Sequence, residues 1–120
     1  MIVHICETSA WQAAQRSGEY RPASLETEGF IHASRPEQVL QVANRFYAGR
    51  SDLLLLWIDP QRLRALVRYE PADGELFPHI YGAVNLDAVR SVLTFPADAD
   101  GVYRRLPGVG GELSQQNSLS

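Results

Sequence analysis

The 120-residue chain has a formal net charge of -3, with 45% hydrophobic and 21% charged residues, a composition typical of one globular domain with its own core. This acidic balance argues against a nucleic-acid partner, because duplex binding needs a concentrated basic face. The single cysteine, Cys6, excludes an intrachain disulfide, and no apolar run approaches the roughly 18 residues that cross a bilayer, so we expect a reduced, cytoplasmic protein without a membrane partner.

The first third of the chain predicts two short strands and a helix. Ile2–Cys6 is short and β-branched, which indicates a strand. A capping box of Ser9 and Gln12 predicts a two-turn helix over residues 9–17. A proline interrupts residues 20–25, which we expect to form an extended loop or edge strand, and a short strand follows over residues 30–33.

A longer helix is predicted over about residues 35–47. Ser34 and Glu37 match a second capping box, and Pro36 suits the first helical turn. Apolar residues then recur every three or four positions, which defines one buried stripe.

Strands are predicted through most of the second half of the chain. Leu53–Ile58 has no alternation of polar and apolar residues, which is typical of a strand buried on both faces, so we place it at the centre of the sheet. Pro71 is expected to end the next strand. The shorter strands are predicted over residues 67–70, 77–82 and 89–95.

This order of elements predicts an α+β fold in which two helices pack on a small mixed β-sheet. We expect one domain over residues 1–105. Residues 106–120 are rich in Gly, Ser and Gln without apolar periodicity, which predicts a flexible C-terminal tail.

All three histidines lie in short hydrophobic segments, on or at the ends of predicted strands. They are His4, His32 and His79, and Glu70 ends a fourth predicted strand. If these strands are neighbours, four titratable groups meet in one cleft. Burying titratable groups is costly unless they are paired or used, so a shared site is the functional interpretation. The alternative is that each histidine only satisfies a backbone carbonyl.

Other polar residues have both a functional and a structural interpretation. Glu70 could orient a ribose hydroxyl or act as a base. Tyr20 and Tyr81 could stack on a base or nicotinamide ring, or simply pack in half-buried positions. Ser34 could donate its hydroxyl to a ligand, although the capping box already gives it a structural role.

The remaining signals are weak. Three arginines could hold a phosphate or form a solvated face, namely Arg62, Arg64 and Arg68. Glycine-rich nucleotide loops, zinc motifs and the G-x-S-x-G nucleophile motif do not occur in the sequence.

Two motifs give the chain a family resemblance: G-F-I-H-A-S at residues 29–34 and F-P-H-I-Y-G at residues 77–82. Together with Trp11 and the Tyr69–Glu70 pair, they resemble the bacterial and plant family called domain of unknown function 952 over about residues 1–95. That family is similar to the ADP-ribosyltransferase and RNA 2'-phosphotransferase superfamily, whose split α+β fold binds NAD or an ADP-ribosylated intermediate between two small sheets.

The resemblance implies a small-molecule nucleotide as partner, with NAD as cofactor, and cleavage or transfer of ADP-ribose by a monomer or weak dimer. It implies catalytic roles for Glu70, which would stabilise positive charge as the glycosidic bond opens, and for His32. The residues it implies for cofactor binding are His4, Tyr20, Ser34, His79 and Tyr81. In that superfamily His79 has no standard counterpart.

Two hypotheses of other classes stay open. The protein could be a non-catalytic module that binds a small metabolite or a partner peptide. It could also be a metal enzyme in which the three histidines are ligands, because three histidines leave an open position on zinc or iron. The chain lacks any close-spaced ligand pair, so we assign no metal ligands.

Overall fold

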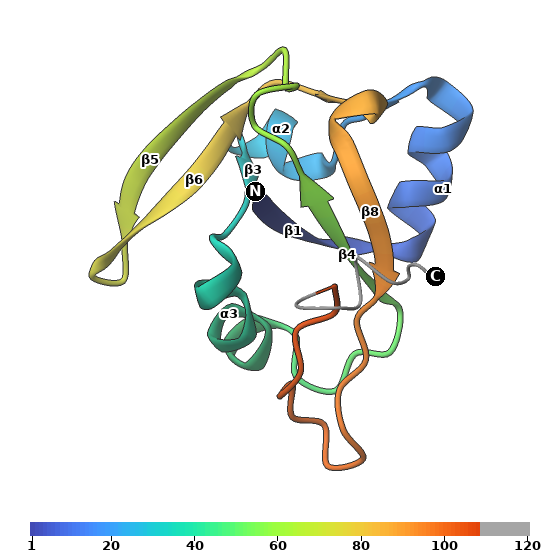
Figure 1. Cartoon of the computed structure of the whole chain (residues 1–120), viewed down its shortest axis with the longest axis vertical. Helices are drawn as coiled ribbons and strands as arrows, with labels where there is room; N and C mark the ends of the chain where they lie inside the picture. The colour runs from blue at the N-terminus through green and yellow to red at the C-terminus, as the bar shows by residue number, and fades with distance from the viewer. Residues whose placement is uncertain (109–120) are drawn as a thin grey trace.

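The computed structural model describes residues 1–108, which form an α+β fold with three small sheets (Figure 1). Every strand pair in this part of the chain is antiparallel. The sheet is therefore split, as predicted. The prediction of a mixed sheet is wrong, because a mixed sheet contains parallel pairs and all of these pairs are antiparallel.

The central sheet has the order β1-β4-β8 and is covered on both faces. Its strands are β1 (Ile2–Glu7), β4 (Leu53–Ile58) and β8 (Val89–Thr94). Helix α1 (Thr8–Ser17) lies on one side of this sheet and α3 (Val39–Phe46) on the other (Figure 1). The apolar run of β4 is buried in the middle, which confirms its predicted central position.

Alternate residues of β1 contribute to two separate core clusters. Ile2 and Cys6 pack with Ala14 of α1, whereas Val3 packs with Val39 of α3. This is the period of two expected when a strand is buried on both faces.

A third sheet projects from the body as a hairpin (Figure 1). Its order is β3-β6-β5, with strands β3 (Ile31–His32), β6 (Glu75–Tyr81) and β5 (Leu66–Ala72). The hairpin turns at Asp73 and Gly74, whose φ angles of 50° and 79° suit a tight two-residue turn. Ile31 and Ile80 point into the core, so the residues next to them on each strand face outward.

The proline in β5 does not end the strand. Pro71 pairs with Leu76 inside β5, which continues to Ala72. Because β5 lies at the edge of its sheet, a residue without an amide hydrogen is tolerated there. Glu70 consequently lies within the strand, and the prediction that it ends the strand is wrong.

The predicted helix over residues 35–47 begins differently from the prediction. A 3-10 turn, η1 (Pro36–Gln38), precedes α3, and Gln38 Oε1 accepts a hydrogen bond from the Arg35 backbone at 2.9 Å. Ser34 is not the cap, because its backbone pairs with Val3 in an extended bridge. The capping box predicted for Ser34 is therefore wrong.

The connecting elements are short. They are β2 (Glu19–Tyr20), which pairs with β7 (Val84–Asn85), helix α2 (Ala23–Thr27) and the 3-10 turn η2 (Leu86–Ala88). The segment at residues 20–25, expected to be an extended loop or edge strand, thus contains the end of a short strand and the start of a short helix that was not predicted.

The predicted tail does not begin at residue 106. Leu106 packs against the second core cluster, and Trp57 Nε1 donates a hydrogen bond to the Pro107 carbonyl at 2.9 Å. The rest of the predicted tail, residues 109–120, lies outside the described residues.

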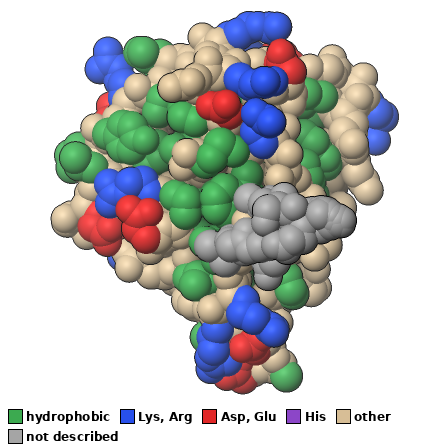
Figure 2. Space-filling view, in the orientation of Figure 1, with side chains coloured by type: hydrophobic (Ala, Val, Ile, Leu, Met, Phe, Trp, Pro, Cys, Tyr) green, Lys and Arg blue, Asp and Glu red, His purple; other side chains and the backbone are tan. Residues whose placement is uncertain are grey.

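Charged side chains of both signs are interspersed over the face shown in Figure 2, with no broad basic surface. None of the helices in residues 1–108 has the length and apolar character needed to cross a bilayer.

Candidate functional site

The outward face of the third sheet carries a cluster of rings and charged groups, which we call the ring site. Its members are Glu28, Phe30, His32, Arg68, Glu70, His79 and Tyr81.

Strand register explains why these residues meet. His79 of β6 lies directly opposite His32 on one side and Arg68 on the other. Side chains in such a row point to the same face and lie about 5 Å apart. The two imidazole ring centres are 5.6 Å apart.

Phe30 joins the rings into one stack. Its ring lies on His79 with centroids 4.1 Å apart and an interplanar angle of 21°. The same ring also contacts His32 at 4.8 Å and Tyr81 at 5.5 Å between centroids. The Arg68 guanidinium lies 5.9 Å from the centre of the Tyr81 ring.

Two donors hold the carboxylate of Glu70 in place. Tyr81 donates its hydroxyl to Glu70 Oε1 at 2.5 Å, and His79 donates Nδ1–H to the same oxygen at 2.7 Å. The bond from Tyr81, followed by that from His79, lowers the pKa of Glu70, so this carboxylate is ionised at neutral pH. The same carboxylate raises the pKa of Tyr81.

His32 forms a second pair of imidazole and carboxylate beside the first. Its Nε2 bonds Glu28 Oε1 at 2.9 Å. The His32 side chain is 56% exposed, against 10% for His79. One histidine of the ring site is therefore open to solvent while the other is held between Phe30 and Glu70.

His4 lies in the interior instead of on this face. Its Nδ1–H donates to the His32 carbonyl at 2.5 Å, and its Nε2 accepts the Tyr20 hydroxyl at 2.7 Å. Burial lowers the pKa of His4 to about 4, so its ring is neutral at physiological pH. The structure thus brings His32 and His79 together and joins His4 to them only through the backbone of His32.

Tyr20 and Ser34 are also interior residues. Tyr20 is buried between His4 and Trp11, and burial raises the pKa of its hydroxyl. Ser34 is buried at the bridge to Val3. Neither residue reaches the ring site, because Tyr20 bonds His4 of β1 and Ser34 is bridged to Val3 of β1.

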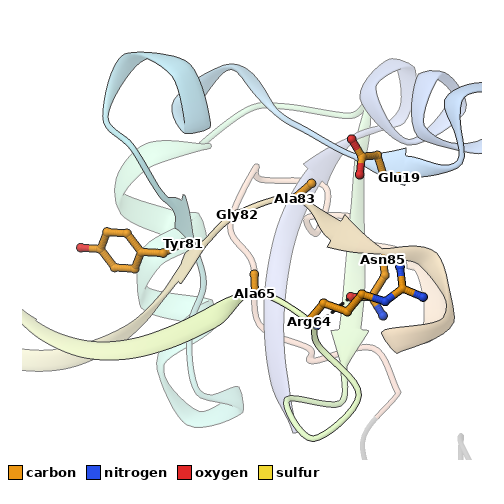
Figure 3. A pocket seen from close by; sticks show the side chains of 7 residues that line it. All are labelled: Glu19, Arg64, Ala65, Tyr81, Gly82, Ala83 and Asn85. Carbon is orange, nitrogen blue, oxygen red and sulfur yellow. Dashed lines mark hydrogen bonds between the residues drawn. The ribbon is translucent and has the colours of Figure 1, made fainter.

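A cavity of about 290 Å³ adjoins the ring site at Tyr81, and we call it the Arg64 pocket (Figure 3). It is lined by Glu19, Arg64, Ala65, Tyr81, Gly82, Ala83 and Asn85. Its walls come from β2, from the segment before β5 and from the end of β6.

The model of one protein family matches residues 5–92, and its description is "Protein of unknown function (DUF952)". The chain belongs to the DUF952 family. The match covers every member of the ring site and begins one residue after His4. No match was found among curated proteins.

Solved structures of CC0527 from Caulobacter crescentus share this DUF952 fold. The crystal structure is 30% identical, with a TM-score of 0.78 over 86% of this chain and 92% of CC0527. The solution structure has the same identity and a TM-score of 0.70, over 86% of this chain and 90% of CC0527.

Sequence reasoning missed two members of the ring site, Phe30 and Glu28, and named a third, Arg68, only as a possible phosphate contact. Phe30 lies two residues before His32, so alternation along a strand could have placed both on one face. Glu28 lies four residues before His32, but no regular element predicted their contact. Arg68 required knowledge of the β5–β6 register, which the sequence does not contain.

The metal hypothesis gains no support from the described part of this DUF952 protein. Within residues 1–108, no group of three or more His, Cys, Asp or Glu side chains is arranged to hold a metal ion. Both ring nitrogens of His4 already have protein partners. In a centre of three histidine ligands, His4 would have to give up one of these two bonds, because a histidine ligates through one ring nitrogen.

Proposed function

We propose that the ring site binds NAD or a related nucleotide, and that Glu70 promotes opening of its glycosidic bond so that ADP-ribose is cleaved or transferred. One observation carries this proposal: an ionised carboxylate is fixed by His79 and Tyr81 beside a partly exposed stack of rings. Superfamily resemblance adds support, since ADP-ribosyltransferases place comparable side chains on their strands.

The charge of the ring site favours a cationic ring. Glu28 and Glu70 contribute two carboxylates, against the single guanidinium of Arg68. Aromatic faces attract cations, and Tyr81 is 37% exposed. The pyridinium ring of NAD therefore fits this surface better than a neutral or anionic group does.

The chemistry would use Glu70 and His32 in different roles. When the bond between ribose carbon and nicotinamide nitrogen breaks, the electron pair leaves with nicotinamide and positive charge develops on the ribose carbon. Glu70 stabilises that charge. Water or an acceptor hydroxyl then adds to the carbon and loses its proton to His32, whose exposed ring is oriented by Glu28.

In this proposal the three interior residues act from a distance. His4, Tyr20 and Ser34 support β3 and its neighbours, and the direct contacts with NAD come from His32, His79 and Tyr81.

A titration with NAD tests this proposal. We expect backbone amide shifts at the ring site and release of nicotinamide, measured by chromatography. Glu70→Gln should bind NAD within a few-fold of wild type but release nicotinamide at least about 100-fold more slowly, since the charge that stabilises the transition state is lost. Glu26→Gln, an exposed residue of α2 outside the site, is the matched control. An absence of NAD-dependent shifts would contradict the proposal.

A non-catalytic binding module is the second candidate. Oε1 of Glu70 is already bonded to both His79 and Tyr81, and such a network can serve binding alone. Amide shifts at the ring site without nicotinamide release, in wild type, would favour this candidate.

A further inference from the structure

We propose that the Arg64 pocket is a phosphate-binding subsite, so that the ligand of the ring site is a phosphorylated nucleoside and not a free base or nucleoside. This inference rests on the proposed function, because the ring site must hold the other end of the same ligand.

The ring site and the Arg64 pocket are continuous along β6. Tyr81 belongs to both sites, and its neighbour Gly82 lines the pocket. A nucleoside monophosphate carries a ring, a ribose and a phosphate, so a ligand of this class has one group for each of the two sites.

Gly82 lies where the two sites meet and packs closely against Ala65. It has no side chain, its φ is 151°, and a Cβ there would lie 3.0 Å from the Ala65 Cβ. In Figure 3 the Tyr81 side chain points away from Arg64, and the methyl group of Ala65 lies between the two residues.

Arg64 supplies an uncommitted guanidinium. Among the described residues, no hydrogen bond or ion pair uses its side-chain nitrogens, whereas Arg62 pairs with Asp59 at 3.9 Å. The Asp87 carboxylate accepts a hydrogen bond from Asn85 at 2.6 Å. This bond lowers the pKa of Asp87, and the nearby charge of Arg64 adds to the effect. A planar guanidinium matches the geometry of phosphate oxygens.

Asn85 fixes the backbone that presents Arg64. Its Oδ1 accepts the Arg64 amide at 3.0 Å, and its Nδ2 donates to the Arg62 carbonyl at 2.9 Å. Asn85 is 7% exposed, so these bonds are shielded from water. The pocket wall is therefore organised before any ligand arrives, which lowers the cost of binding.

Glu19 sets the orientation of the ligand within the pocket. Its carboxylate lies 3.6 Å from Arg21 and repels phosphate, so the phosphate belongs on the Arg64 side. Ribose hydroxyls can donate to Glu19. A volume of about 290 Å³ is small for a ligand site and suits one ribose phosphate better than a whole dinucleotide.

Affinities for two ligands that differ by one phosphate test the inference. We expect wild type to bind nicotinamide mononucleotide about 10-fold to 100-fold more tightly than nicotinamide riboside, measured by amide shifts. Arg64→Gln should remove most of this preference while affinity for the riboside stays unchanged. Arg64→Lys, which keeps the charge but loses the planar fork, should lie between the two.

Arg62→Gln is the matched control, because Arg62 is exposed nearby but does not line the pocket. An equal loss of preference in this variant would show a general charge effect and overturn the subsite. Equal affinities of wild type for both ligands would overturn it too, with the proposed function intact. If neither of these ligands nor NAD binds, the proposed function fails and the subsite with it.

Discussion

The interior around His4 and the surface around His32 and His79 use the same side chain in opposite ways. Both ring nitrogens of His4 have protein partners, and its imidazole is neutral and buried. In the described residues, His32 and His79 each bond a carboxylate through one nitrogen, and the other nitrogen has no protein hydrogen bond. A histidine with one nitrogen fixed and the other unbonded can exchange protons, whereas one with both nitrogens bonded holds segments together.

The largest effect should come from the interior. His4→Ala removes two buried hydrogen bonds and leaves a cavity between β1 and β3, so we expect the free energy of unfolding to fall by about 3 kcal/mol. Urea unfolding at pH 7.5 measures this loss. Tyr20→Phe, which deletes only the hydroxyl that Nε2 accepts, should cost about 1–2 kcal/mol. A loss below about 1 kcal/mol for His4→Ala would remove the distinction between the two regions.

Stability should also depend on pH through His4. The pKa of His4 is lowered to about 4 in the folded protein, against about 6.5 in the unfolded chain. The unfolded state therefore binds more protons between these values, so stability is fully present above about pH 6.5 and falls as the pH drops toward 4. The loss amounts to at most about 3 kcal/mol. Urea titrations at pH 7.5, 6 and 5 should show this slope in wild type and a flatter one in His4→Gln.

The surface histidine should show the reverse pattern. His32→Ala should change the free energy of unfolding by less than about 0.5 kcal/mol, because its side chain is largely exposed. If it serves a nucleotide, the same variant should weaken nucleotide binding by about 1–3 kcal/mol. Both quantities are measured on one preparation, by urea unfolding and by ligand titration. A stability loss without a change in binding would take His32 out of the site.

The smallest effect should come from Glu28. Glu28→Gln keeps the size of the side chain and removes the charge beside His32, so we expect nucleotide binding to weaken only about threefold with stability unchanged. Rescue at higher pH is not expected, since Gln does not titrate. A loss as large as that of His32→Ala would show that Glu28 contacts the ligand itself.

Local signals in the sequence predicted much of the fold. The apolar run of β4 and the helix after β1 were both predicted from short local patterns. That helix nevertheless begins at Thr8 with Glu7 as its N-cap, so the capping box predicted for Ser9 is wrong. The error at Pro71 arose because an edge strand tolerates proline, and the sequence does not show which strand lies at an edge. The capping error at Ser34 arose because a tertiary bridge to β1 outweighed a local motif.

The candidate site was less predictable than the fold. His4 and His32 both follow apolar residues, and only the pairing of their strands decides that one is enclosed and the other open. Glu70 and Tyr81 were named from the sequence, but their shared hydrogen bond depends on the register between β5 and β6. Such register is a long-range property that composition and spacing do not encode.

Pro71 has a consequence for how copies of this protein avoid one another. A free strand edge offers unpaired amides on which another chain can add a strand, which is a route to aggregation. Within residues 1–108 no strand pairs with the outer edge of β5, which carries the half-exposed Tyr69. Pro71 has no amide hydrogen to give an incoming strand, so it interrupts the ladder near the hairpin tip. Pro71, which was predicted to end the strand, thus disfavours strand addition at the edge of the sheet that carries Glu70.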